Sequence, residues 1–111
     1  HLCQPLSPAV IRILESVVET CNREGKPVTL CGEMAGQPQA FVLLLGMGLR
    51  RFSMSPAFVP TIKELAAQIS LSKCGELLGV AKKQNTTRRI HSLLTKELSQ
   101  LAPQLLPVLM Q

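Results

Sequence analysis

Two short strand-like runs, each followed by a helix that begins near a proline, constrain this chain more than any other feature. The run Pro27–Cys31 is rich in β-branched residues and has breakers on both sides, which predicts a short buried parallel strand. Gly32–Gln37 is predicted to be a loop, and Pro38 to start a helix that ends at Gly46 and Gly48. Strand, loop and helix together make one βα unit, with Cys31 at the carboxyl end of its strand.

A second unit follows the first. The segment Arg51–Ser55 alternates in side-chain size and predicts a strand, and Pro60–Ile69 carries apolar residues at helical spacing. Before the first unit, Ser7 and Pro8 form a helix start, and the helix is expected to run up to Gly25. If both strands lie in one parallel sheet, the connection between them is a right-handed crossover.

Beyond residue 70 the pattern predicts helices without strands, at 72–83 and 87–101, and the tail 103–111 is expected to be an irregular strap or partly disordered. Two parallel strands need neighbours, because parallel sheets are normally buried on both faces. We therefore expect an α/β fold that exposes apolar edge and face unless more chain completes the sheet.

Composition excludes several classes of protein. Of the 111 residues, 46% are hydrophobic, which predicts a folded chain with an aliphatic core. Twelve basic residues against seven acidic ones give a net charge of +5, but no basic run is longer than two and there is no Trp or Tyr for base stacking. The basic residues are therefore interpreted as solvated helix faces, and no nucleic-acid partner is expected; a small basic nucleic-acid binder is kept as a lesser alternative.

The cysteines predict neither a disulfide framework nor a zinc site. They stand at Cys3, Cys21, Cys31 and Cys74 without a C-x-x-C pair, and only two histidines accompany them. No apolar run is long enough for a membrane span, so no membrane partner is expected. Because the chain begins with His1 and lacks a signal-peptide pattern, it is interpreted as an internal segment of a cytoplasmic protein.

Three ordered motifs carry a resemblance to a known family. They are Leu30–Pro38, with the sequence LCGEMAGQP, then Leu43–Leu49, with LLLGMGL, and Phe52–Pro56, with FSMSP. Together they resemble the end of the phosphoenolpyruvate (PEP)-utilising enzymes. The chain is most similar to enzyme I of the bacterial phosphotransferase system, and within it to the nitrogen-related PtsP type of PEP-protein phosphotransferase.

The resemblance implies a fold. The family's catalytic domain is a TIM-type (β/α)8 barrel, so this chain would be a C-terminal fragment: the last two βα units, the helix before them, and C-terminal helices. Residues 1–70 would be a partial PEP-binding barrel and 71–111 a helical extension of the same domain. Val28–Cys31 would be the seventh strand and Phe52–Ser55 the eighth, and such barrels place their chemistry at the carboxyl ends of the strands.

The resemblance also implies an activity. The family moves the phosphoryl group of PEP to a histidine on a separate domain and then to a small HPr-like phosphocarrier protein, releasing pyruvate. Its CGE cysteine, here Cys31, is the general acid that protonates the enolate of pyruvate. Thiols suit this step because an ordinary thiol, with a pKa of about 8.5, is mostly protonated near neutral pH. Gly32 and Glu33 are the expected substrate-binding residues.

Some of the family's functional groups are not expected in this chain. The ligands of its Mg²⁺ cofactor, the arginines that hold the substrate phosphate, and the phosphorylated histidine come from segments with motifs that do not occur here. His1 and His91 lack the context of a phosphohistidine, and Gln37 stands where the family commonly has an acidic residue. The chain alone is therefore expected to hold no metal and to be inactive.

Two alternatives stay open. The chain could act as a dimerisation or interaction module, since the family's barrel domain also forms its dimer, and unpaired sheet edges favour self-association. It could also come from another PEP-utilising enzyme, of the pyruvate phosphate dikinase or PEP synthase type.

Overall fold

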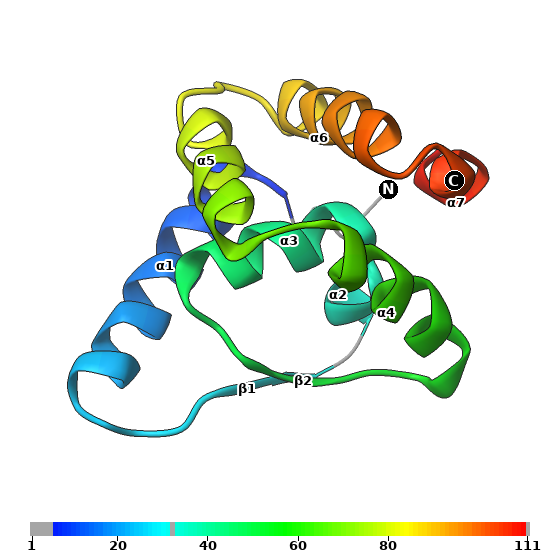
Figure 1. Ribbon diagram of the computed structural model, residues 1–111. Coiled ribbons are helices and arrows are strands. Elements are labelled where there is room, and N and C mark those ends of the chain that lie inside the picture. The colour runs from blue at the N-terminus through cyan, green and yellow to red at the C-terminus, as the bar shows by residue number, and fades with distance from the viewer. Residues whose placement is uncertain (1–5, 32, 111) are drawn as a thin grey trace.

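Helices make up most of the protein, and a small two-stranded parallel sheet completes it (Figure 1). The computed structural model describes residues 6–31 and 33–110. In chain order the elements are α1 Pro8–Arg23, β1 Thr29–Cys31, α2 Glu33–Gly36, α3 Pro38–Met47, β2 Arg51–Ser53, the 3₁₀ helix η1 Pro56–Phe58, α4 Val59–Gln68, α5 Leu71–Ala81, α6 Thr87–Leu101, the 3₁₀ helix η2 Pro103–Leu105 and α7 Leu106–Leu109.

Helix α3 lies at the centre of the fold. Every residue from Pro38 to Leu44 is buried, which is expected of a helix that is apolar on nearly all sides. Figure 1 shows the sheet on one side of α3, with α5 and α6 on the other. At ten residues, α3 is far too short for a bilayer, and no other helix in the described ranges is long and apolar enough to cross one.

Caps confirm the predicted starts of α1 and α6, and a third cap starts α5 at Leu71 rather than at the predicted residue 72. The hydroxyl oxygen of Ser7 accepts a hydrogen bond from the amide of Val10 at 3.2 Å, with Pro8 in the first turn of α1. Ser70 accepts one in the same way at the start of α5, and Thr86 does so at the start of α6. Each cap satisfies an amide that the helix itself leaves free.

Three expectations about the connections were wrong. Residues 33–36, predicted as loop, form the short helix α2. Gly46 does not end α3: the helix continues to Met47, and Gly48 alone, with φ of 105°, takes the left-handed conformation that ends it. The tail from Pro103 is neither irregular nor disordered up to residue 110, because it folds as η2 and α7 and buries Leu105 and Leu109.

The two strands pair in parallel, as predicted, but they are not buried on both faces. Leu30 and Phe52 are partners in register and are half-buried against the core. The ring of Phe52 packs on that of Phe41 in α3, with the ring centroids 4.9 Å apart. This contact anchors the apolar face of the sheet to the central helix.

The other face of the sheet is exposed, and its composition differs from the expectation. It carries Thr29 and Cys31 from β1 and Arg51 and Ser53 from β2, all four exposed. We expected an apolar face to be uncovered; the uncovered face is polar instead. Alternation along each strand explains this, because successive side chains point to opposite sides of a sheet.

Candidate functional site

Cys31 is the last residue of β1, and its side chain lies on the exposed face of the sheet. The prediction that this cysteine ends a strand is confirmed. Among parallel strands, side chains at the carboxyl ends gather at one edge of the sheet, which is where ligands bind in α/β folds. Its position therefore leaves the thiol free to reach a molecule bound at this edge.

The two residues after Cys31 were expected to bind substrate. Gly32 lies outside the described residues. Glu33 is the first residue of α2. The substrate-binding roles of Gly32 and Glu33 stay predictions.

Ser53 lies beside Cys31. In the parallel register Cys31 pairs with Ser53 and Thr29 pairs with Arg51, so each pair sits side by side on the exposed face. Sequence reasoning interpreted Ser53 only as a strand residue. The missing signal was the register, which a single sequence does not fix when strands are three residues long.

The segments that follow the two strands are held together by a close contact. Gly36, at the end of α2, packs under the ring of Phe58 in η1, where a β-carbon would lie 2.6 Å from two of the ring carbons. Ala35 beside it is completely buried. Both residues therefore contribute to close packing at this point.

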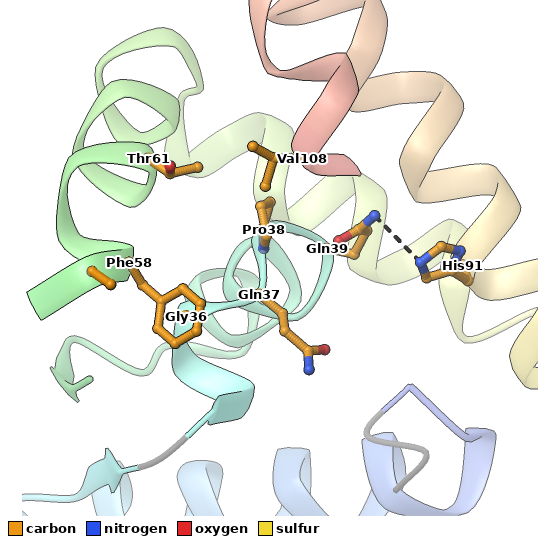
Figure 2. A pocket seen from close by; sticks show the side chains of 9 residues that line it. Gly36, Gln37, Pro38, Gln39, Phe58, Thr61, His91 and Val108 are labelled. Carbon is orange, nitrogen blue, oxygen red and sulfur yellow. Dashed lines mark hydrogen bonds between the residues drawn. The ribbon is translucent and has the colours of Figure 1, made fainter. Parts of the chain in front are cut away.

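A pocket of about 520 Å³ opens next to this contact (Figure 2). Its walls come from the start of α3, from η1 and α4, and from α6 and α7. Gln37 lines it and is half-buried, and His91 lines it from α6. Cys31 is not part of its wall, so the pocket and the exposed thiol are separate features at neighbouring parts of the chain.

Gln39 is the polar residue that sequence reasoning missed. Its side chain is 5% exposed, and its Nε2 donates hydrogen bonds to the carbonyl oxygen of Leu109 at 3.0 Å and to Oγ1 of Thr95 at 3.1 Å. Nε2 of His91 lies 3.4 Å from the same nitrogen, as Figure 2 shows. Gln39 thus joins α3 to α6 and α7, which is a structural use of a buried amide.

The described cysteines other than Cys31 are read as structural. Cys74 is completely buried between helices, and this burial raises the pKa of its thiol, an effect that the nearby Arg50 guanidinium partly opposes. Cys21 is half-buried on α1. Cys3 lies outside the described residues. Among the cysteines that the structure describes, Cys31 is thus the exposed one.

The basic pair Arg50 and Arg51 is exposed, in agreement with the solvated role that was expected. Arg50 nevertheless has a structural contact: its Nη1 donates to the carbonyl oxygens of Leu45 at 2.8 Å and Leu49 at 2.9 Å. A cation that binds the last carbonyls of a helix is stabilising there because of the helix dipole.

Metal-ligating side chains do not gather in the part of the chain that the structure describes. Within residues 6–31 and 33–110, no three His, Cys, Asp or Glu side chains lie close enough together to hold an ion. The described residues therefore do not fit a magnesium site of their own.

Comparison with known proteins gives a family match. Residues 1–71 match the model of the family described as "PEP-utilising enzyme, PEP-binding domain". The matched region ends at the first residue of α5 and includes both strands, all of α3 and the thiol of Cys31.

The curated relatives are named as phosphoenolpyruvate-protein phosphotransferases or multiphosphoryl transfer proteins. The chain is 44% identical over 96 residues to a phosphoenolpyruvate-protein phosphotransferase of Buchnera aphidicola from Schizaphis graminum, covering 86% of this chain and 17% of that protein. It is 52% identical over 64 residues to one of Cupriavidus necator, covering 58% and 11%. Multiphosphoryl transfer protein 1 of Escherichia coli is 36% identical over 94 residues, covering 85% and 11%. The chain thus spans less than a fifth of these relatives' length.

Proposed function

The chain belongs to the PEP-utilising enzyme family, through that family's PEP-binding domain, and from this membership we propose that it is the terminal part of a PEP-protein phosphotransferase. The whole protein would transfer the phosphoryl group of PEP to a histidine outside this chain, and from there to an HPr-like phosphocarrier. The observation that carries the proposal is the family match across a strand whose last residue is an exposed cysteine.

Cys31 would act as the proton donor. When the phosphoryl group leaves PEP, the electron pair of the broken P–O bond stays on oxygen and gives the enolate of pyruvate. The methylene carbon of the enolate then takes the proton from Sγ of Cys31, which leaves a thiolate and releases pyruvate. The exposed position at the strand end supports this role, since the thiol has open space on the face where a substrate would lie.

The rest of the machinery would come from outside this chain. The Mg²⁺ cofactor, which would neutralise charge on the phosphoryl group, needs ligands that the described residues do not supply together. Within the described residues, β1 and β2 pair only with each other, which supports the proposal that further strands continue the sheet, as in a (β/α)8 barrel. In that barrel, residues 1–70 would be part of the barrel domain and 71–111 its helical extension. The isolated chain would then be inactive, and pyruvate formation from PEP by the isolated chain would contradict this.

The proposed role of Cys31 can be tested in the full-length enzyme that carries this segment. Cys31→Ala is expected to slow exchange of the pyruvate methyl protons with solvent by a factor of about 100 or more, the usual contribution of a general acid. Cys21→Ala is the matched control, because that thiol is half-buried on α1, away from the strand ends. Equal exchange rates in the two variants would refute the assignment.

Self-association is a second candidate function, favoured by two observations. Each strand has a single partner in the described part of the chain, so both outer edges of the sheet expose unpaired backbone groups. On α1, Ile13 and Val17 lie one turn apart and are 63% and 46% exposed. Sedimentation of the isolated chain at increasing concentration tests this, and a monomer at every concentration would argue against it.

A further inference from the structure

The register of the two strands places a hydroxyl beside the thiol of the proposed site. We propose that Ser53 is a positioning residue that hydrogen-bonds Sγ of Cys31 and directs its proton toward the substrate. The inference rests on the proposed function, in which Cys31 is the proton donor. It adds a residue from β2 that neither the family match nor the relatives' names assign.

The geometry follows from the pairing. Cys31 and Ser53 are Cα partners in a parallel ladder, and both side chains are exposed on the same face. Adjacent strands lie about 4.8 Å apart, and partners in register point the same way. The hydroxyl of Ser53 and the thiol of Cys31 therefore stand on neighbouring strands, level with each other and on the same face.

The charged residue of β2 is less well placed than Ser53. Arg51, the cation of β2, pairs with Thr29, two residues before Cys31 along the strand. At about 3.3 Å per residue, this pair lies about 6.6 Å along the strand from the pair Cys31 and Ser53. Across the ladder, Ser53 is thus the hydrogen-bonding residue that β2 places level with the thiol.

A serine is chemically suited to both states of the thiol. Its hydroxyl oxygen can accept the S–H hydrogen bond before the transfer, which fixes the direction of the proton. After the transfer the hydroxyl can rotate and donate to the thiolate, and hydrogen bonds to a charged partner are the stronger kind. No atom beyond those of the proposed reaction is needed, since Ser53 neither gains nor loses a proton.

The fold holds this arrangement in place. Phe52, between Arg51 and Ser53, is packed on Phe41 with ring centroids 4.9 Å apart. A slip of the register by one residue would move Phe52 to the exposed face and Ser53 into the core, and that would cost the buried contact. The position of Ser53 beside Cys31 is therefore coupled to the packing of the sheet on α3.

The test compares Ser53→Ala, Ser53→Thr and a control with Cys31→Ala, all in the full-length enzyme. Ser53→Ala is expected to slow proton exchange at the methyl group of pyruvate about tenfold, from loss of one hydrogen bond to a charged group. The KM for PEP and the rate of phosphohistidine formation from PEP should stay unchanged. Ser53→Thr keeps the hydroxyl and should restore exchange. Ser72→Ala, at an exposed serine of α5, is the matched control.

The outcomes separate this inference from the proposed function. If Cys31→Ala abolishes exchange while Ser53→Ala behaves like Ser72→Ala, only the role of Ser53 is refuted. If Cys31→Ala has no effect on exchange, the proposed function itself fails. If Ser53→Ala lowers phosphohistidine formation and exchange equally, or Ser53→Thr does not restore exchange, Ser53 has a structural role and the inference is wrong.

Discussion

Replacing Gly46 by alanine should destabilise the protein, although alanine is the better helix former. Gly46 lies inside α3, where the helix crosses α5 closely: a β-carbon there would be 2.6 Å from the carbonyl oxygen of Cys74 and 3.0 Å from its carbonyl carbon. Both atoms are backbone, so no rotamer change can relieve the contact. The helices would have to separate by roughly 0.8 Å at this point to restore ordinary van der Waals spacing.

Two opposing effects set the change in the free energy of unfolding that Gly46→Ala causes. Alanine in a helix interior is favoured over glycine by about 1 kcal/mol. Overpacking of a close-packed core costs about 1–3 kcal/mol, and the upper end applies here because the neighbour is backbone. The net effect is a loss of about 2 kcal/mol in the free energy of unfolding, or a fall in Tm of about 8 °C at about 4 °C per kcal/mol for a chain of this size.

Gly75→Ala is the matched control, because the substitution is the same and the site is on the partner helix α5. A β-carbon at Gly75 meets nothing within 4 Å, and its φ is not positive. This variant should gain about 0.5–1 kcal/mol. Urea unfolding followed by circular dichroism measures both variants, and shifts of the same sign in Gly46→Ala and Gly75→Ala would refute the reasoning.

Three further changes have expected outcomes. Gln39→Ala removes a donor to the buried residue Leu109 and should cost about 1–3 kcal/mol in urea unfolding; Gln39→Glu should not restore it, because an ionised carboxylate cannot donate. Ser70→Ala removes the cap of α5 and should lower the free energy of unfolding by about 1 kcal/mol, whereas Ser70→Asp should retain most of it. Burial raises the pKa of Cys74 above 9.0, so the folded state keeps a proton that the unfolded chain loses at higher pH. The stability advantage over Cys74→Ala should then be constant below pH 9.0 and shrink above it, and thermal scans from neutral to alkaline pH that show no such change would contradict this.

Local sequence signals located most of the elements. Ser7 and Pro8 start α1 as predicted, and Pro38 starts α3, because a proline in the first turn and a hydroxyl cap act over three or four residues. Both strands begin and end within two residues of the predicted bounds. Such features depend on neighbours in the chain, which a single sequence contains.

Features that depend on distant partners were missed. Gly46 was interpreted as a helix end, since glycine commonly ends helices, but its reason is the approach of α5 almost thirty residues later. Gln39 stands among apolar residues with no local explanation, and its partner Leu109 is seventy residues away. Neither contact leaves a pattern in the sequence, because tertiary packing alone brings these atoms together.

The candidate site shows the same division. Placing Cys31 at a strand end needed only the breakers around Pro27–Cys31, whereas Ser53 beside it needed the register. Parallel strands normally bury both faces, and this sheet buries only one within the described residues. Here the polar face carries a thiol and a hydroxyl side by side, and Leu30 and Phe52 fix the other face to the core. The packing of Leu30 and Phe52 on the core thus fixes the positions of Cys31 and Ser53 on the polar face.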